Sequence, residues 1–209
     1  MSSYLTIQGT AHAEIEEKKS RFIAHITHAK TEEEALAFLE SIRSEHRMAR
    51  HNVYAYIIRG TGTSERIRYS DDGEPQKTAG LPTLQTLQHA HLTDVAIVTT
   101  RYFGGTLLGT GGLVRAYTQA AQAGIEAAHI VTISQCVDIT ITSAYSWYDR
   151  LMRLAHESNA HVIDTCYTDT VVITLRMLNG TQHAFLKALT ELFHGNECVE
   201  ISAPFNAAF

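Results

Sequence analysis

The chain has 209 residues, of which 44% are hydrophobic, so it can bury one large core or two smaller ones and is not expected to be disordered. It contains no apolar run long enough to span a membrane, and residues 1–4 lack the features of a signal peptide, so we expect a cytoplasmic protein. Residues 1–132 carry 13 basic and 14 acidic side chains, whereas residues 133–209 carry 4 and 8. A nucleic-acid surface needs clustered cations and is therefore expected only in the first part.

Cysteine and histidine patterns indicate no metal centre. The three cysteines, Cys136, Cys166 and Cys198, form no C-x-x-C pair and are expected to be reduced core residues. His89 and His91 form an H-x-H pair that has no third ligand nearby in the sequence. We therefore expect neither a bound metal nor a cofactor.

Residues 1–132 predict a mixed domain of strands and helices. A helix is expected to begin at Thr31, because its hydroxyl can accept an N–H while Glu34 lies three residues later, as in a capping box. Residues 60–80 are rich in turn formers and are expected to contain little regular structure. Further helices are expected at residues 82–89 and 113–128, and strands at residues 4–8, 12–16, 22–28, 53–58 and 95–100.

Residues 133–209 predict a second domain. Helical spacing of apolar residues occurs at 147–156 and 181–193. Alternating or β-branched segments indicate strands at residues 135–142, 160–166, 170–178 and 198–201. The resulting order, βαββαβ, is that of a ferredoxin-like module. We therefore expect an α+β protein with domains at 1–132 and 133–209.

The segment from Arg101 to Arg115 places five glycines between an apolar strand and a helix. Such a loop lets backbone approach a ligand closely and presents the unpaired N–H groups of the next helix, which favours an anion. The alternative is that the glycines only allow tight turns and that the arginines pair with structural acids. The candidate anion-binding residues here are Arg101, Tyr102, Gly104, Gly105, Gly109, Gly111, Gly112 and Arg115.

Two common phosphate motifs do not fit this segment. A Walker A loop has Lys and Ser or Thr after its last glycine, whereas Leu113 and Val114 follow Gly112. A Rossmann fingerprint needs a small residue where Val114 stands and an acidic residue about twenty positions later, which is absent. A different kind of anion site is therefore expected.

An acidic turn lies earlier in the chain, at Asp72-Gly73-Glu74. These carboxylates could hold a divalent cation, although calcium-loop spacing is absent, or could position Arg101 and Lys77. Because turns with Asp and Gly are common surface structures, we expect ligand or arginine contacts here rather than a metal.

A basic turn and one histidine complete the candidate site. Lys18, Lys19 and Arg21 could contact phosphates or could simply be solvated. His51 stands at the start of a strand, where it could bind phosphate, shuttle a proton or cap the strand. All four are kept as candidate anion-binding residues.

Long motifs make the chain similar to the IMPACT family and to its bacterial YigZ-like branch. The resemblance is carried by KKSRFI at 18–23, ARHNVYAY at 49–56, SDDGEP at 70–75 with TAG at 78–80, and the glycine-rich segment. It implies a first domain like domain 2 of ribosomal protein S5 and a second like the ferredoxin-like C-terminal domains of elongation factors. Members often have cysteine where Val53 stands, so a thiol nucleophile is not available at that position.

The resemblance also implies a role in translation. The eukaryotic namesake is similar to a regulator that competes for an activator of an initiation-factor kinase, and bacterial members are suspected of binding nucleic acid or the ribosome. No nucleophile, base and orienting group can be assembled from this sequence. We therefore expect a regulatory protein that binds RNA, the ribosome or a translation factor through a phosphate-like anion site. The alternative is an enzyme that acts on a small phosphorylated metabolite or nucleotide.

Overall fold

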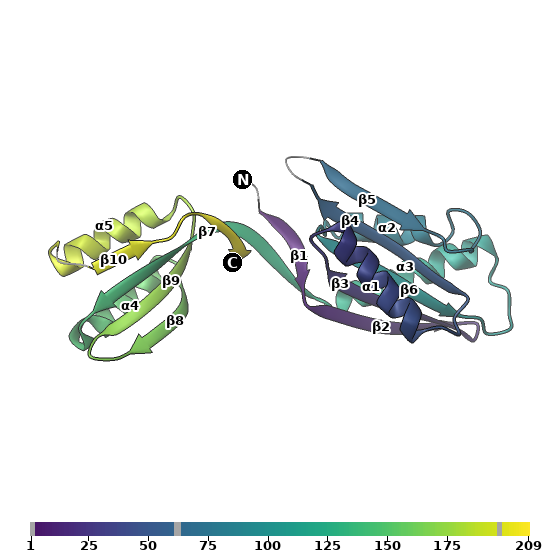
Figure 1. Cartoon of the computed structure of the whole chain (residues 1–209), viewed down its shortest axis with the longest axis horizontal. Coiled ribbons are helices and arrows are strands. Elements are labelled where there is room, and N and C mark those ends of the chain that lie inside the picture. Colours follow the sequence, from purple (N-terminus) through teal and green to yellow (C-terminus); the bar gives the residue numbers. More distant parts are fainter. Residues whose placement is uncertain (1–2, 61–63, 196–197) are drawn as a thin grey trace. The chain divides into compact units, whose positions relative to one another are not determined.

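The computed structural model describes residues 3–60, 64–195 and 198–209, and it divides into two compact units with separate cores (Figure 1). Tyr4–Val131 forms one unit, and Thr132–Phe209 belongs to the other. The mixed α and β class expected from the sequence is confirmed. Residues 1–2 of the N-terminal segment and 61–63 of the turn-rich segment lie outside the described residues.

The first unit is built on an antiparallel sheet. Its strands are β2 (Thr10–Glu17), β3 (Ser20–His28), β4 (His51–Arg59), β5 (Glu65–Ser70) and β6 (Val95–Tyr102), which follow β1 (Tyr4–Gln8) in the chain. The order across the sheet is β2-β3-β6-β4-β5, with every neighbouring pair antiparallel. β6 therefore lies at the centre, which explains its almost fully buried apolar sequence.

Helices cover both faces of this sheet. α1 (Glu32–Glu45) packs Leu39 and Ile42 against Val98 on one face. α2 (Gly80–His89) and α3 (Gly109–Glu126) pack on the other face, in the larger core that contains Leu87 and Tyr117. The predicted cap of α1 is confirmed, since the Thr31 hydroxyl accepts the N–H of Glu34 at 3.2 Å.

β5 shows that the expectation of little regular structure in residues 60–80 is wrong. It pairs with β4 from Tyr54↔Ser70 to Arg59↔Glu65. The sequence signal is weak because β5 is the edge strand and is largely exposed, with Ile67 as its apolar contact to the core. An edge strand with polar side chains is also protected from pairing with other chains.

α3 begins four residues earlier than its apolar pattern predicts. Gly109, Gly111 and Gly112 lie in its first turn, so only Gly104 and Gly105 belong to the loop. The turn is held by Leu108 and Leu113, which are both buried in the core of the unit. Tertiary packing has here overridden the low helix propensity of glycine.

The second unit has one sheet and two main helices. Its elements are β7 (His129–Ser143), a short 3₁₀ turn η1 (Tyr145–Trp147), α4 (Tyr148–Glu157), β8 (His161–Tyr167), β9 (Val171–Leu178), α5 (Gln182–Phe193), β10 (Cys198–Ile201) and β11 (Phe205–Ala208). β10, β7, β9 and β8 lie in that order as antiparallel neighbours. The predicted sequence of six elements is confirmed, whereas β11, which pairs with the first part of β7, was not predicted.

The exposure of the cysteines and the character of the helices can be compared with what the sequence predicted. Cys136 is buried, but Cys166 and Cys198 are exposed, so the expectation that all three are core residues is wrong. Both exposed cysteines lie on strands of the second sheet whose alternation is weak. Within the described part of the chain, no helix has both the length and the apolar character needed to cross a membrane.

Candidate functional site

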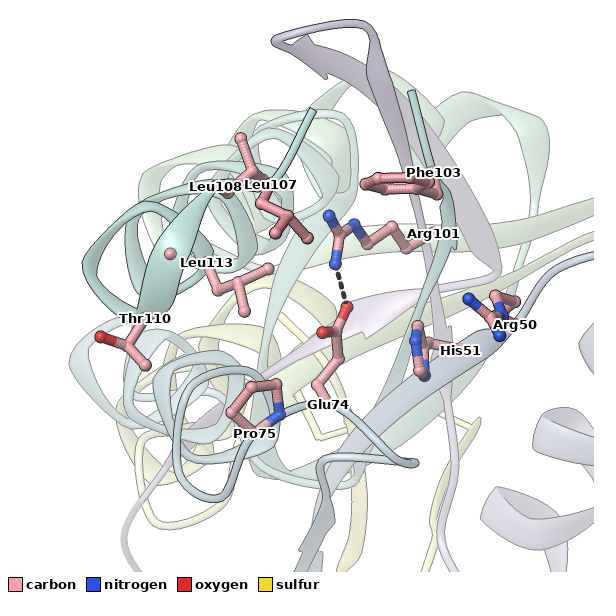
Figure 2. Close-up of a pocket in the computed structure, with 11 residues that line it drawn as sticks. Arg50, His51, Glu74, Pro75, Arg101, Phe103, Leu107, Leu108, Thr110 and Leu113 are labelled. Carbon is pink, nitrogen blue, oxygen red and sulfur yellow. Dashed lines mark hydrogen bonds and ion pairs between the residues drawn. The ribbon is translucent and has the colours of Figure 1, made fainter. Parts of the chain in front are cut away.

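The first unit contains a cavity of about 410 Å³ at the glycine-rich segment (Figure 2). Its volume falls in the usual range of small-molecule sites. The polar part of its wall consists of Arg50, His51, Glu74 and Arg101. The rest is mostly apolar and consists of Pro75, Phe103, Leu107, Leu108, Gly109, Thr110 and Leu113.

A buried ion pair lies at the centre of the polar wall. Arg101 near the end of β6 donates from Nη1 to Glu74 Oε1 at 2.6 Å, and the two residues are only 7% and 9% exposed. Tyr117 of α3 donates its hydroxyl to the same oxygen at 2.9 Å. Burial, followed by the adjacent Glu74 carboxylate, raises the pKa of Tyr117, so the hydroxyl keeps its proton and remains a donor.

This pair does not use all of its polar atoms. The Arg101 Nε is buried and has no hydrogen-bond partner among the described residues, and its Nη2 makes no hydrogen bond there either. Glu74 Oε2 is likewise unused by the described side chains. Because an unpaired buried donor is costly, a ligand that supplied a partner for Arg101 Nε would be stabilised at this wall.

His51 is held as one tautomer beside the pair. Its Nδ1 lies 2.7 Å from the carbonyl oxygen of Asp72, and because a carbonyl can only accept, Nδ1 carries the hydrogen. The neutral ring therefore has its lone pair on Nε2. Gly73 permits this contact, since its φ is +85° and a Cβ there would lie 3.4 Å from Nδ1.

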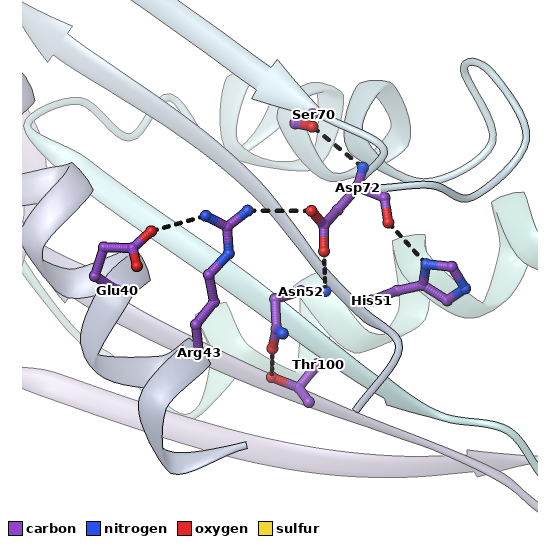
Figure 3. A network of polar contacts seen from close by, with 7 residues as sticks. All are labelled: Glu40, Arg43, His51, Asn52, Ser70, Asp72 and Thr100. Carbon is purple, nitrogen blue, oxygen red and sulfur yellow. Dashed lines mark hydrogen bonds and ion pairs between the residues drawn. The ribbon is translucent and has the colours of Figure 1, made fainter. Parts of the chain in front are cut away.

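Asp72 does not line the cavity and belongs instead to a structural network (Figure 3). Its carboxylate accepts from Arg43 Nη2 at 3.1 Å and from the backbone N–H of Asn52 at 2.6 Å. Arg43 also pairs with Glu40 of α1 at 2.8 Å. Asp72 therefore fixes the turn and, through its carbonyl, His51. Across the described residues, no group of three or more His, Cys, Asp or Glu side chains could hold a metal ion.

The basic turn lies against the glycine loop. A Cβ on Gly104 would lie 2.0 Å from the carbonyl carbon of Lys19, and the Gly104 N–H donates to Ser20 Oγ at 3.1 Å. Lys18 and Lys19 are exposed, have φ of 47° and 67°, and form no ion pair with any described residue. They therefore offer two free charges on a tightly constrained turn, and neither lysine is part of the cavity wall.

Three other predicted residues lie outside the cavity wall. Arg21 is neutralised by Glu14 at 2.7 Å. Tyr102 bonds to His46 at 3.0 Å on the α1 side of the sheet, because successive strand residues face opposite sides. Arg115 is exposed on α3 and forms no ion pair within the described part of the chain.

The structure brings His51, Glu74, Arg101 and Gly109 together at one wall. The sequence interpretation did not name Arg50, which precedes His51 in the chain, as a site residue. It also missed the apolar residues between the glycines, of which Phe103 is 50% and Leu107 is 83% exposed. Large apolar residues inside a glycine-rich segment were the available signal, since a glycine loop does not need them for turning.

The fold and cavity define a two-unit α+β protein with a cavity that has both polar and apolar walls. Residues 18–125 match the model of the Impact N-terminal domain, and residues 141–196 match that of a domain of unknown function, DUF1949. The chain is 36% identical over 203 residues to the IMPACT family member YvyE of Bacillus subtilis, covering 96% of this chain and 91% of YvyE. The chain belongs to the IMPACT family.

Other relatives agree with this assignment. The chain is 31% identical over 196 residues to the IMPACT family member YigZ of Escherichia coli, covering 94% of this chain and 96% of YigZ. A Protein IMPACT homolog of Dictyostelium discoideum is 38% identical over 97 residues, which are 46% of this chain and 28% of that protein. A crystal structure described as that of a hypothetical protein has a TM-score of 0.62 and 32% identity, and covers 95% of this chain and 97% of its own.

Proposed function

We propose that the protein regulates translation by binding RNA, free or within the ribosome, through the cavity and the cations around it. The observation that carries this proposal is the cavity itself, which combines an apolar wall with unused arginine donors beside a helix start. A translation factor with an acidic segment would be an alternative partner at the same cations.

The architecture supports the proposal at the level of fold. Antiparallel strands in the order β10-β7-β9-β8, connected through α4 and α5, are arranged as in a ferredoxin-like domain. We assign the second unit to that class and the first unit to the class of ribosomal protein S5 domain 2. Because fold alone does not define function, the assignment only adds to the argument from the site.

The charges around the cavity suit a few phosphates. Arg50, Lys18 and Lys19 are exposed and have no ion-pair partner among the residues described. No described side chain caps the start of α3, so its first N–H groups remain available to an anion. We therefore expect a small phosphate footprint rather than an extended basic surface.

The experiment is a titration of single-stranded RNA and of ribosomes over a series of salt concentrations. Each phosphate contact contributes a slope of about −0.7 in a plot of log affinity against log salt for a single strand. Arg50→Gln and Lys19→Gln should each make the slope shallower by about that amount, whereas Arg68→Gln on the edge strand β5 should not. Binding that is insensitive to salt, or equally affected by all three variants, would contradict the proposal.

An enzyme acting on a small phosphorylated metabolite is the second candidate. It is favoured by the lone pair on His51 Nε2, which could accept a proton beside Arg101. Thermal unfolding with sugar phosphates and nucleotides separates the two functions. A large rise in melting temperature with such a compound, together with absent RNA binding, would favour the enzyme.

A further inference from the structure

The polar groups of the cavity are divided into a neutral centre and two cationic poles. Figure 2 shows Arg50 and Thr110 on opposite sides of the Arg101–Glu74 pair. Arg50 supplies a free guanidinium at one pole, and Thr110 marks the uncapped start of α3 at the other. An anion is favoured at each pole, whereas the paired charges of Arg101 and Glu74 leave the centre neutral.

The polar centre of the cavity has both acceptors and donors for a hydroxyl group. His51 and Arg101 are cross-strand partners on β4 and β6, so both face the same side of the sheet. The unused acceptors there are His51 Nε2 and Glu74 Oε2, and the unused donors belong to Arg101, whose Nε is buried without a partner. A hydroxyl can donate to one of these acceptors and accept from the guanidinium at the same time.

The apolar wall of the cavity offers an aromatic surface on which a flat ring can stack. Phe103 is half exposed at the cavity, and the Arg101 guanidinium lies 5.8 Å from the centre of its ring. Leu107, which also lines the cavity, is almost fully exposed. Nucleic-acid bases stack on such aromatic faces without regard to sequence. A ligand that covered both side chains would remove an exposed apolar patch from water.

We infer that the cavity binds one nucleotide of a single RNA strand, with its ribose 2′-hydroxyl donating to His51 Nε2 and accepting from Arg101, and with its two flanking phosphates at the poles. The inference rests on the RNA binding proposed above and adds where the strand lies and what is recognised. A strand passing through the cavity accounts for anion sites on both sides of a neutral centre. Because deoxyribose lacks the 2′-hydroxyl, the site distinguishes RNA from DNA.

The test compares an oligoadenylate RNA with the deoxy and 2′-O-methyl strands of the same length. The wild-type chain should bind RNA roughly tenfold more tightly than either analogue, since the deoxy strand has no group to pair with His51 or Arg101 and the 2′-O-methyl oxygen has no proton to donate to His51 Nε2. Equal affinity for RNA and DNA would overturn the inference and leave the proposed RNA binding intact. Absence of binding to every strand would contradict the proposed function itself.

Paired variants of His51 locate the contact. His51→Asn keeps an N–H near the Nδ1 position for the Asp72 carbonyl and removes the Nε2 acceptor, so the preference for RNA should disappear while the melting temperature changes little. His51→Gln retains a polar group near the Nε2 position and should keep part of the preference. The control Arg68→Gln should keep all of it. An unchanged preference in His51→Asn would overturn the assignment of the hydroxyl to this residue.

A free nucleotide offers the cavity the same base, ribose hydroxyl and phosphate groups as an RNA strand does. Adenosine monophosphate added to the RNA complex should displace the strand only at a concentration at least a hundredfold above that of a competing oligonucleotide, since it reaches only one pole. Displacement at equal concentrations would show that the cavity is a mononucleotide site and would overturn the part of the inference that concerns a strand.

Discussion

Gly104 is a residue at which packing leaves no space for a side chain. A Cβ there would meet the backbone of Lys19 at 2.0 Å, and backbone atoms cannot move aside as a flexible side chain can. Gly104→Ala should therefore lower the free energy of unfolding by about 2–3 kcal/mol. Urea denaturation measures this change.

Gly111→Ala is the matched control. Gly111 lies in the first turn of α3, and the nearest atom to its added Cβ would be the flexible Arg115 Nη1 at 3.7 Å. Alanine favours the helix, so this variant should be unchanged or more stable by up to about 1 kcal/mol. Equal losses at both glycines would show that the close approach to Lys19 is not the cause.

The ion pair of Arg101 and Glu74 gives a second prediction at this scale. Removing one partner of a buried pair leaves an uncompensated charge, so Glu74→Ala should cost about 3–5 kcal/mol of stability. The double variant Glu74→Leu with Arg101→Met should cost less than Glu74→Ala alone, because no buried charge remains. A double-mutant cycle of Glu74→Leu and Arg101→Met by urea denaturation tests this, and additive losses would contradict it.

The face of the sheet that α1 covers carries a histidine cluster with a predicted pH dependence. Burial, followed by the neighbouring His46 and His12, lowers the pKa of His25 below its usual 6.5, while Glu45 opposes this change. His46 also bonds to Tyr102 there, and the Nε2 atoms of His25 and His46 have no hydrogen-bond partner among the described residues.

The sign follows from proton binding. The folded chain binds fewer protons at His25 than the unfolded chain, so this contribution to stability is complete above about pH 6.5 and is lost as the pH falls toward the lowered pKa. The free energy of unfolding should therefore decrease from about pH 7.5 to pH 5.5. In His25→Gln this dependence should be shallower. An identical pH profile for the two proteins would show that other groups cause it.

Helices and strands with strong local sequence patterns were predicted correctly, and those with weak patterns were not. α1 was predicted because Thr31 and Glu34 form a cap and its apolar stripe is regular. β5 and β11 were not, because each lies at the edge of a sheet and has few buried side chains. The start of α3 was misplaced because glycines hide a helical turn that Leu108 and Leu113 stabilise through the core.

At the scale of the whole molecule, the two units have separate cores. Leu189 of α5 is fully buried in the second core, so Leu189→Ala should cost about 2–5 kcal/mol there. Amide exchange should then accelerate in residues 132–209 and stay slow in α3 and β6, and affinity for RNA should be retained. Equal loss of protection in both units would show that they unfold as one cooperative unit.

The sequence alone determined the family and the mixed α and β class of the protein, and it indicated the region of the candidate site. Local patterns are sufficient for this, because periodicity, caps and the glycine-rich segment act within a few residues of one another. It indicated Arg101, His51 and Glu74 as candidates but could not separate them from Asp72, Tyr102 and Arg115.

Only the tertiary structure decided which of these side chains face the cavity. Strand register puts His51 opposite Arg101, whereas Tyr102, one residue along, faces the other side of the sheet. Asp72 does not line the cavity and pairs instead with Arg43, which lies twenty-nine positions earlier in the chain. Such choices depend on contacts between distant segments, and these contacts form only when the sheet assembles and buries its side chains.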